Sequence, residues 1–255
     1  MFDLNNGLIH HLEFTAPWQA TMTYVSFIIV SMICAYLLGS INSAIIVSKL
    51  FYRDDIRTHG SGNAGLTNTL RTYGKKAAVM TLAGDMLKTA LAIFITGFLM
   101  GFNYKAGISY NEGYCYMAGL FVVLGHIFPA FYGFKGGKGV LCTATMALIL
   151  TPIPFLILLA LFIAVVGVSK YVSLGSVTVA VLYPVVVNGY ISLTFGRAHA
   201  ILSLCTILLA ITIVWCHRAN LERISNRTER KISFNKSDVE VKEDKKSDIH
   251  EDDDE

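Results

Sequence analysis

Seven long apolar stretches divide the chain, and this pattern constrains its fold more than any other feature. They cover residues 22–50, 77–102, 114–132, 140–150, 155–168, 172–193 and 200–215. A helix needs about 20 apolar residues to cross the hydrocarbon core of a bilayer. Hydrophobic residues make up 54% of the chain and charged residues only 15%, which is more apolar than a soluble core requires. We therefore predict an all-α membrane protein.

The distribution of positive charge predicts which loops face the cytoplasm. Basic residues gather in four segments: Arg53 to Lys76, Lys135 with Lys138, Lys170, and Arg218 to Lys231. The positive-inside rule places all four on the cytoplasmic side. This requires two spans between successive basic segments, and so seven transmembrane helices with the amino terminus outside and the carboxy terminus cytoplasmic. The fourth and fifth stretches are short, so two tilted helices, a re-entrant pair and one broken helix are the alternatives there.

The composition changes at both ends of the chain. Residues 1–21 lack the basic start of a cleavable signal peptide, and we expect them to form a retained extracytoplasmic segment. Residues 22–223 form the predicted membrane domain. Residues 224–255 are expected to be a charged cytoplasmic tail, largely disordered, because the acidic stretch from residue 237 has almost no apolar residues. The five cysteines are isolated, and neither a metal nor a cofactor is expected.

A first polar block lies in the loop after the first apolar stretch. It contains Gly60, Ser61, Gly62, Asn63, Asn68 and Arg71. Glycines and small polar residues can expose backbone N–H groups to an oxyanion, and an arginine can hold a phosphate with two parallel hydrogen bonds. A flexible linker is the alternative, but a linker does not require amides and a cation.

A second block, Lys135, Gly136, Gly137, Lys138 and Gly139, precedes the fourth stretch. Glycines on both sides of Lys138 let the backbone approach a ligand closely, and the lysine offers a point charge to a phosphate. The block is not a P-loop, because a glycine follows the lysine. For His126, at the end of the preceding apolar stretch, a packed residue and a functional residue are both open interpretations.

Two further blocks complete the set. Ser173 and Ser176 are three residues apart and share one face of a helix at the start of the sixth stretch. His217, Asn220 and Arg223 follow the seventh stretch at helical spacing. All four blocks are predicted to lie on one side of the membrane, and together they indicate a phosphate-handling site.

The order of these motifs resembles the bacterial acyl-phosphate:glycerol-3-phosphate acyltransferase family. The matching motifs are Gly39-Ser40-Ile41, Asp55-Ile56-Arg57, Gly60-Ser61-Gly62-Asn63, Thr67-Asn68 with Arg71, Asp85 with Lys88, Gly125-His126, Phe128-Pro129, Phe134 to Val140, Tyr171 to Leu174, and His217-Arg218 with Asn220 and Arg223. The chain departs from the family at Asn42, Leu66, Thr89 and Gly175, and none of these changes removes a cation or an amide.

The resemblance implies a reaction and a set of site residues. Glycerol 3-phosphate would attack an acyl phosphate directly at the cytoplasmic face of a bacterial plasma membrane, giving lysophosphatidate in phospholipid synthesis. The implied catalytic residues are Ser61, Arg71, Lys138, His217 and Asn220. The implied phosphate-binding residues are Gly60, Gly62, Asn63, Asn68, Lys135, Gly136, Gly137, Gly139, Ser173 and Ser176, with the working serine of the last two left open.

The resemblance also leaves the general base as either His217 or the substrate's own phosphate. It implies no cofactor, no nucleic acid and no protein partner, with membrane lipid as the surroundings. The H-x-x-x-x-D signature of the larger acyl-CoA-dependent acyltransferases is absent, which favours an acyl phosphate donor. The alternative function is a transporter for an organic phosphate or another anion. Transporters usually carry internal repeats, and the sequence shows none that is convincing.

Overall fold

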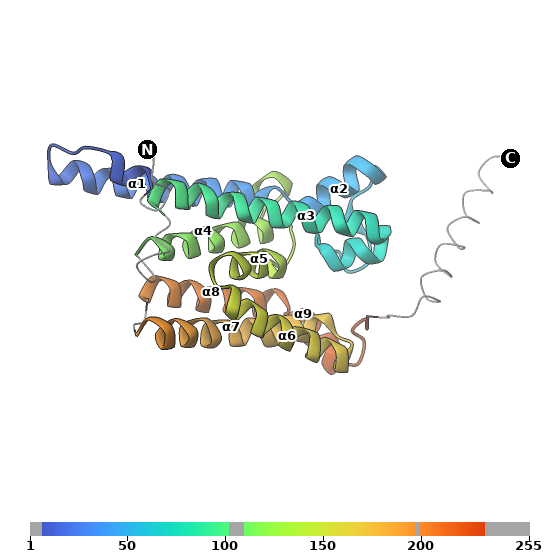
Figure 1. Cartoon of the computed structure of the whole chain (residues 1–255). Coiled ribbons are helices and arrows are strands. Elements are labelled where there is room, and N and C mark those ends of the chain that lie inside the picture. The colour runs from blue at the N-terminus through green and yellow to red at the C-terminus, as the bar shows by residue number, and fades with distance from the viewer. Residues whose placement is uncertain (1–6, 102–109, 197–198, 233–255) are drawn as a thin grey trace.

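The computed structural model describes residues 7–101, 110–196 and 199–232, and these residues form a bundle of helices (Figure 1). The elements are η1 Leu8–His11, α1 Pro17–Ser40, α2 Ser43–Tyr52, η2 Ile56–Thr58, α3 Leu66–Met100, α4 Tyr110–Ile127, η3 Ala130–Tyr132, α5 Val140–Leu150, α6 Pro152–Ser169, α7 Val172–Phe195, α8 Ala200–Cys216 and α9 Arg218–Ser225. All regular structure in the described ranges is helical, which confirms the all-α prediction. The acidic stretch from residue 237 lies outside the described residues.

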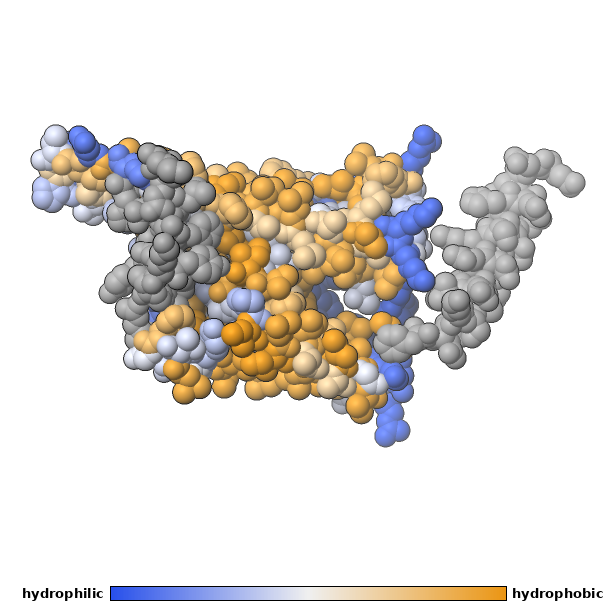
Figure 2. Space-filling view, viewed as in Figure 1, coloured by the Kyte–Doolittle hydropathy of each residue, from blue (hydrophilic) through white to orange (hydrophobic). Residues whose placement is uncertain are grey.

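The surface of the bundle fits a bilayer. Figure 2 shows apolar residues across the middle of the bundle, many strongly hydrophilic residues at the end that holds α2 and α9, and fewer at the opposite end near the start of α1. Among the described residues, five helical segments are long and apolar enough to cross a membrane, or six if the bent pair α8 and α9 counts as one span. Helix α5 has 11 residues and rises only about 16 Å, which is too short to cross alone.

The first apolar stretch is broken, where the sequence had indicated one continuous span. Helix α1 ends at Ser40 and α2 begins at Ser43. Asn42 caps α2, since its Oδ1 accepts a hydrogen bond from the backbone N–H of Ile45 at 3.1 Å. The buried Lys88 of α3 donates to the carbonyls of Gly39 and Ile41 at 3.1 and 2.9 Å. The backbone groups freed at the break therefore have hydrogen-bond partners within the membrane domain.

Helices α5 and α6 meet at a single residue, Thr151, where the sequence had placed a connection of four residues. Pro152 and Pro154 begin α6, and Pro152 occupies the first helical turn, where its missing N–H costs no hydrogen bond. Figure 1 shows this turn well short of the end of the bundle where α7 turns toward α8. The two helices thus enter the bundle and return to the end where α7 begins, which matches the re-entrant alternative for this pair.

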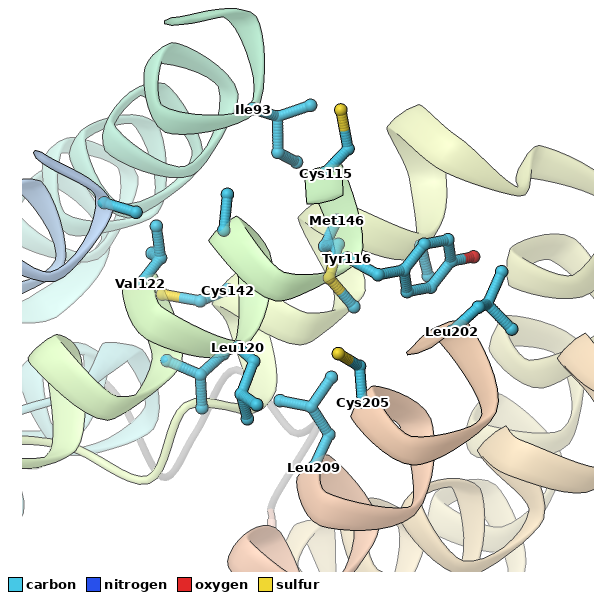
Figure 3. Close-up of a cluster of buried hydrophobic side chains, with 14 of the residues drawn as sticks. Ile93, Cys115, Tyr116, Leu120, Val122, Cys142, Met146, Leu202, Cys205 and Leu209 are labelled. Atoms are coloured by element: carbon cyan, nitrogen blue, oxygen red, sulfur yellow. The ribbon is translucent and has the colours of Figure 1, made fainter. Parts of the chain in front are cut away.

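Helix α4 lies at the centre of the bundle. Figure 3 shows Tyr116 and Leu120 of α4 packed between residues of α5 and α8. Cys142 and Cys205 are part of this core. Helix α1 crosses α4 closely because Gly39 and Gly125 lie at the contact, and a Cβ added at either residue would collide with backbone of the other helix. The core thereby fixes the end of α4 that carries His126.

Candidate active site

A cavity of about 570 Å³ lies where the beginnings of α3, α5, α7 and α9 come together. Figure 1 shows these helix ends at the same end of the bundle. All four polar blocks contribute to the lining, through Gly60, Ser61, Asn63, Asn68, Arg71, Lys138, Gly139, Ser173, Ser176, His217, Asn220 and Arg223. Segments separated by up to about two thirds of the chain therefore meet in one place, as the positive charge pattern had indicated.

The other residues predicted for the site, Gly62, Lys135, Gly136 and Gly137, are not part of the cavity lining. Gly136 and Gly137 instead donate backbone hydrogen bonds to the carbonyls of Ile127 and His126, at 3.1 and 3.0 Å. A Cβ on either glycine would collide with His126 or its carbonyl. These two glycines bring the backbone before Lys138 against the end of α4, and thereby position the lysine.

Asn68 organises the first block. Its Oδ1 accepts a hydrogen bond from the backbone N–H of Ser61 at 3.1 Å, and its Nδ2 donates to the carbonyls of Ile56 and His59 at 3.2 and 3.0 Å. Gly60 has a φ of 61°, and a Cβ there would collide with the Asn68 side chain. The side chain of Asn68 thus closes the loop that carries Ser61.

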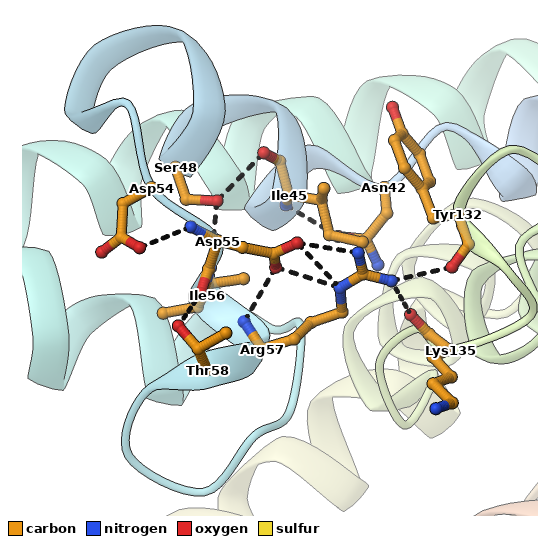
Figure 4. A network of polar contacts seen from close by, with 10 residues as sticks. All are labelled: Asn42, Ile45, Ser48, Asp54, Asp55, Ile56, Arg57, Thr58, Tyr132 and Lys135. Atoms are coloured by element: carbon orange, nitrogen blue, oxygen red, sulfur yellow. Dashed lines mark hydrogen bonds and ion pairs between the residues drawn. The ribbon is translucent and has the colours of Figure 1, made fainter.

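The segment just before the first block is tied to the loop of the second block through Arg57 (Figure 4). Arg57 and Asp55 form a bidentate pair, with NH2 to Oδ2 at 2.7 Å and Nε to Oδ1 at 3.0 Å. The same guanidinium donates to the carbonyls of Tyr132 at 2.7 Å and Lys135 at 3.4 Å. The hydrogen bonds from Arg57 keep the pKa of Asp55 below its usual value although partial burial opposes this. Arg57 therefore holds two loops together from outside the cavity.

Lys138 begins a chain of hydrogen bonds across the cavity wall. Its Nζ donates a short hydrogen bond to Oδ1 of Asn220. Nδ2 of Asn220 in turn donates to Oγ of Ser173 at 2.9 Å and to Oε1 of Glu229 at 2.6 Å. Side-chain hydrogen bonds thus connect the second block directly to the fourth, and the fourth to the third. Burial lowers the pKa of Lys138 from 10.5 to about 8, and the positive charge of Arg223 contributes to this shift.

Glu229 is the site residue that the sequence did not reveal. Its carboxylate accepts hydrogen bonds from Ser173, Asn220 and Arg223 at 2.6, 2.6 and 2.8 Å. Burial raises its pKa, but these hydrogen bonds outweigh burial and the pKa lies below its usual value. The residue follows the domain boundary predicted at 223 and stands among basic residues typical of a topology signal. Glu229 is the single acid between Arg223 and Lys231, and this is the one sequence feature that pointed to it.

His217 marks the break between α8 and α9, which are bent by 52°. The sequence had indicated one continuous helical face for His217, Asn220 and Arg223, and the break rotates α9 so that all three still line the cavity. Nδ1 of His217 lies 2.8 Å from the carbonyl oxygen of Ile213. That contact requires the proton on Nδ1, so the tautomer leaves Nε2 with a lone pair.

The two serines of the third block differ in their hydrogen bonds. Oγ of Ser173 donates to Glu229, whereas Oγ of Ser176 donates to the backbone carbonyl of Val172 at 3.0 Å. Arg71 donates to the carbonyl of Arg230 at 3.4 Å, so the segment after α9 also lies against the first block. Both serines and the arginine line the cavity.

Most of the remaining cavity lining is apolar. Each of three helices contributes one face at spacings of three and four residues, consisting of Val140, Ala144 and Ala147 on α5, Phe155, Leu158, Leu159 and Phe162 on α6, and Val179, Ala180 and Tyr183 on α7. We call this part the apolar arm. Along α5 and α7 it begins directly after the polar residues Lys138 and Ser176. A ligand that fits the whole cavity has an anionic end and an apolar end.

Comparison with known proteins identifies the family to which this chain is similar. Residues 29–227 match the family described as glycerol-3-phosphate acyltransferase. The glycerol-3-phosphate acyltransferase of Clostridioides difficile is 42% identical over 219 residues, covering 84% of this chain and all of that protein. The protein of the same name from Bacillus subtilis is 40% identical over 203 residues, covering 80% of this chain and 96% of that protein.

Solved structures agree with the sequence relatives. The crystal structure of an integral membrane glycerol 3-phosphate acyltransferase in its glycerol 3-phosphate form superposes with a TM-score of 0.69 at 29% identity, covering 81% of this chain and 96% of that chain. Its lysophosphatidic acid form gives a TM-score of 0.65.

Proposed function

Because the chain belongs to the glycerol-3-phosphate acyltransferase family of integral membrane acyltransferases, we propose that it transfers the acyl group of an acyl phosphate to the sn-1 hydroxyl of glycerol 3-phosphate. The products are lysophosphatidate and inorganic phosphate. The observation that carries the proposal is a single cavity with cations and amides at one end and an apolar arm at the other. An acyl phosphate has the same division between an anionic head and an apolar chain.

The side chains at the polar end of the cavity are suited to bind two phosphates side by side. Arg71, Lys138 and Arg223 supply positive charge, and Ser61, Ser173 and Asn220 supply neutral hydrogen-bond donors. Holding both anions in one place brings the glycerol hydroxyl to the acyl carbon and lowers the entropic cost of the reaction. The cations also stabilise the negative charge of the departing phosphate.

A direct attack fits the side-chain chemistry better than a covalent acyl-enzyme. Neither serine of the third block has a histidine as its hydrogen-bond partner among the described residues, since Ser173 donates to Glu229 and Ser176 to a backbone carbonyl. His217 lines the cavity, has a lone pair at Nε2 and is one candidate for the general base. The phosphate of the substrate is the other.

The proposed arrangement in the membrane has seven helical membrane segments, of which the fourth and fifth, α5 and α6, enter and return as a re-entrant pair. The amino terminus lies outside, and the cavity opens at the cytoplasmic face of a bacterial plasma membrane. Support comes from the hydrophilic residues at the end of the bundle that holds α2 and α9. Residues 1–21, 22–223 and 224–255 remain the proposed divisions of the chain, with Glu229 added to the site from the third.

One assay tests the donor and the acceptor together. Purified protein in detergent is supplied with glycerol 3-phosphate and palmitoyl phosphate, and inorganic phosphate and lysophosphatidate are measured in parallel. We expect equal amounts of both products without any added protein or cofactor. Turnover with palmitoyl-CoA but not with palmitoyl phosphate would overturn the donor assignment. Phosphate release without lysophosphatidate would overturn the acceptor assignment.

A further inference from the structure

A buried ion cluster borders the cavity between α3 and α4. Nζ of Lys88 lies 2.8 Å from Oδ1 of Asp85 and 3.0 Å from Nδ1 of His126, and all three side chains are at least nine-tenths buried. Oδ1 of Asp85 also accepts a hydrogen bond from Ser43 at 2.9 Å. The ion pair balances the charges of Asp85 and Lys88, so His126 is the neutral member of the cluster.

Lys88 determines which nitrogen of His126 carries the proton. The ammonium of Lys88 has three hydrogens, which it shares among Asp85, the carbonyls at the break between α1 and α2, and Nδ1 of His126. An N–H on Nδ1 would point at this positive charge, so Nδ1 presents its lone pair to Lys88. Asp85 is 3.7 Å from Nδ1, which is too long for a hydrogen bond. The proton of the neutral ring is therefore on Nε2. His126 lines the cavity, and its ring hydrogen bonds to the described residues are all at Nδ1, so the Nε2–H is left for a ligand.

A second polar group, buried in the wall of the cavity, lacks a partner. Thr143 of α5 is 7% exposed, and among the described residues its hydroxyl makes no hydrogen bond. Threonines in helices usually bond the carbonyl four residues earlier, as Thr145 does with Leu141 at 2.9 Å. A buried hydroxyl without a partner costs folding free energy, and a ligand oxygen would satisfy it.

The position of these two groups along the cavity identifies the ligand atom. Thr143 follows Lys138 by five residues and precedes the apolar residues Ala144 and Ala147 on the face of α5 that lines the arm. His126 lies directly against Gly137, the residue before Lys138. Both groups thus lie at the junction of the anionic end and the apolar arm. In an acyl phosphate the atom group at that junction is the carbonyl.

We propose that the Nε2–H of His126 and the hydroxyl of Thr143 donate hydrogen bonds to the carbonyl oxygen of the bound acyl donor and stabilise the oxyanion formed during transfer. This inference rests on the proposed function. The glycerol oxygen forms a bond to the acyl carbon, and the carbonyl electron pair moves onto the oxygen. The pair then re-forms the carbonyl as the bond between carbon and the phosphate oxygen breaks. The hydroxyl proton ends on the departing phosphate, so atoms and charges balance.

Two pairs of variants separate this role from a structural one. In His126→Gln the amide nitrogen takes the position of Nε2 and keeps the donor to the cavity. In His126→Asn the amide oxygen takes the position of Nδ1 and keeps the contact with Lys88 instead. Thr143→Val removes the hydroxyl at nearly constant volume, and Thr143→Ser keeps it. The thermal midpoint of each variant in detergent reports its folding.

We expect kcat to fall about 100-fold in His126→Asn and Thr143→Val, the usual effect of one lost oxyanion donor, with the KM for glycerol 3-phosphate within about twofold. His126→Gln and Thr143→Ser should retain at least about a tenth of the wild-type kcat. A higher kcat for Asn than for Gln at position 126, or a wild-type kcat in Thr143→Val, would overturn the proposal. The threonine pair leaves the ion cluster intact, so it tests the proposal even where a histidine variant does not fold.

A spectroscopic measurement completes the test. A non-hydrolysable acyl phosphonate retains the carbonyl, and its infrared stretch should move to lower frequency on binding to the wild-type protein. The shift should shrink in His126→Asn and Thr143→Val, and an unchanged shift in both would contradict the assignment. Wild-type turnover of palmitoyl phosphate tests the proposed function separately, because a wild-type protein without turnover refutes that function whatever the variants do.

Discussion

Lys138 places an ammonium group in a largely buried position, where it contacts Asn220 and faces the cavity. Arg71 faces the same cavity from α3, whereas Lys135 lies outside its lining. We expect Lys138→Ala and Arg71→Ala each to lower kcat/KM at least about tenfold, since each removes a charge that stabilises the transition state by about 1.4 kcal/mol or more. Lys135→Ala should change it by less than about threefold. Steady-state kinetics with both substrates measures the three effects, and equal small effects would show that these cations serve topology alone.

The buried position of Lys138 also predicts a pH dependence. Its pKa is lowered to about 8, so the ammonium is present below that pH and is lost as the pH rises through it. Because kcat/KM reports the free enzyme, it should fall above about pH 8. The fall in kcat should occur at higher pH, since a bound phosphate stabilises the ammonium. Profiles from neutral pH to about pH 10 measure both, with correction for spontaneous hydrolysis of the donor.

Lys138→Arg is the control for this assignment, because a guanidinium stays charged throughout the range. Its kcat/KM should be lower than that of the wild type but should not fall near pH 8. The same alkaline fall in the arginine variant would mean that another group titrates.

At the residue scale, the sequence predicted those site residues that stand out from their neighbours. Lys138 between glycines and Asn220 after a final span exceed what a turn or a topology signal needs. Glu229 was missed because Ser173 lies 56 residues earlier and Asn220 lies nine residues earlier, on the other side of the end of α9, so no regular spacing shows its burial. His126 remained ambiguous because its role depends on Lys88, which lies 38 residues earlier.

At the element scale, the contact of Arg57 with two loops is open to a direct test. We expect Arg57→Ala to raise the KM for glycerol 3-phosphate more than it lowers kcat, because the polar blocks would lose their relative position while the catalytic groups stay. The carbonyl of Tyr132 and the carboxylate of Asp55 would each lose a charged donor, at a cost of about 1–3 kcal/mol in unfolding free energy. Kinetics and the thermal midpoint measure the two effects.

Lys76→Ala is the matched control for Arg57→Ala, since Lys76 is an exposed cation of the same end of the bundle. Its KM and thermal midpoint should be those of the wild type. If Lys76→Ala raised the KM as much as Arg57→Ala does, the effect would be due to net charge rather than to loop position.

The helices could be predicted where segment length and hydropathy determine their ends. They were harder to predict where a contact with another helix determines a break. The apolar stretches at α3, α4, α6, α7 and α8 each correspond to a helix. The break between α1 and α2 was not visible, because the carbonyls it frees are satisfied by Lys88 on another helix. For α5 and α6 the sequence left three alternatives, since short apolar runs look alike whether they cross the membrane or return.

At the scale of the whole molecule, the site extends past α9 into the carboxy-terminal segment. A chain that ends after Lys236 should keep its specific activity within about twofold, because it retains Glu229 and the backbone hydrogen bond from Ile232 to Lys170. A chain that ends after Arg227 should lose at least about tenfold, since Glu229 and its hydrogen bonds are removed. Activity per amount of monodisperse protein measures both.

A full-length Glu229→Gln variant separates the carboxylate from the segment that carries it. It should be less active than the wild type but more active than the chain that ends after Arg227. Loss of activity in the chain that ends after Lys236, in protein that still elutes as a folded species, would show that the acidic residues take part in catalysis.

Because the cavity is lined by residues from most of the chain, its residues are synthesised at different times during translation. Gly60 to Arg71 emerge early from the ribosome, whereas Asn220 and Glu229 are among the last described residues to be made. A chain inserted only as far as α7 has Lys138 without the asparagine that holds its ammonium. We therefore expect no acyl transfer by the growing polypeptide until its translation is nearly complete.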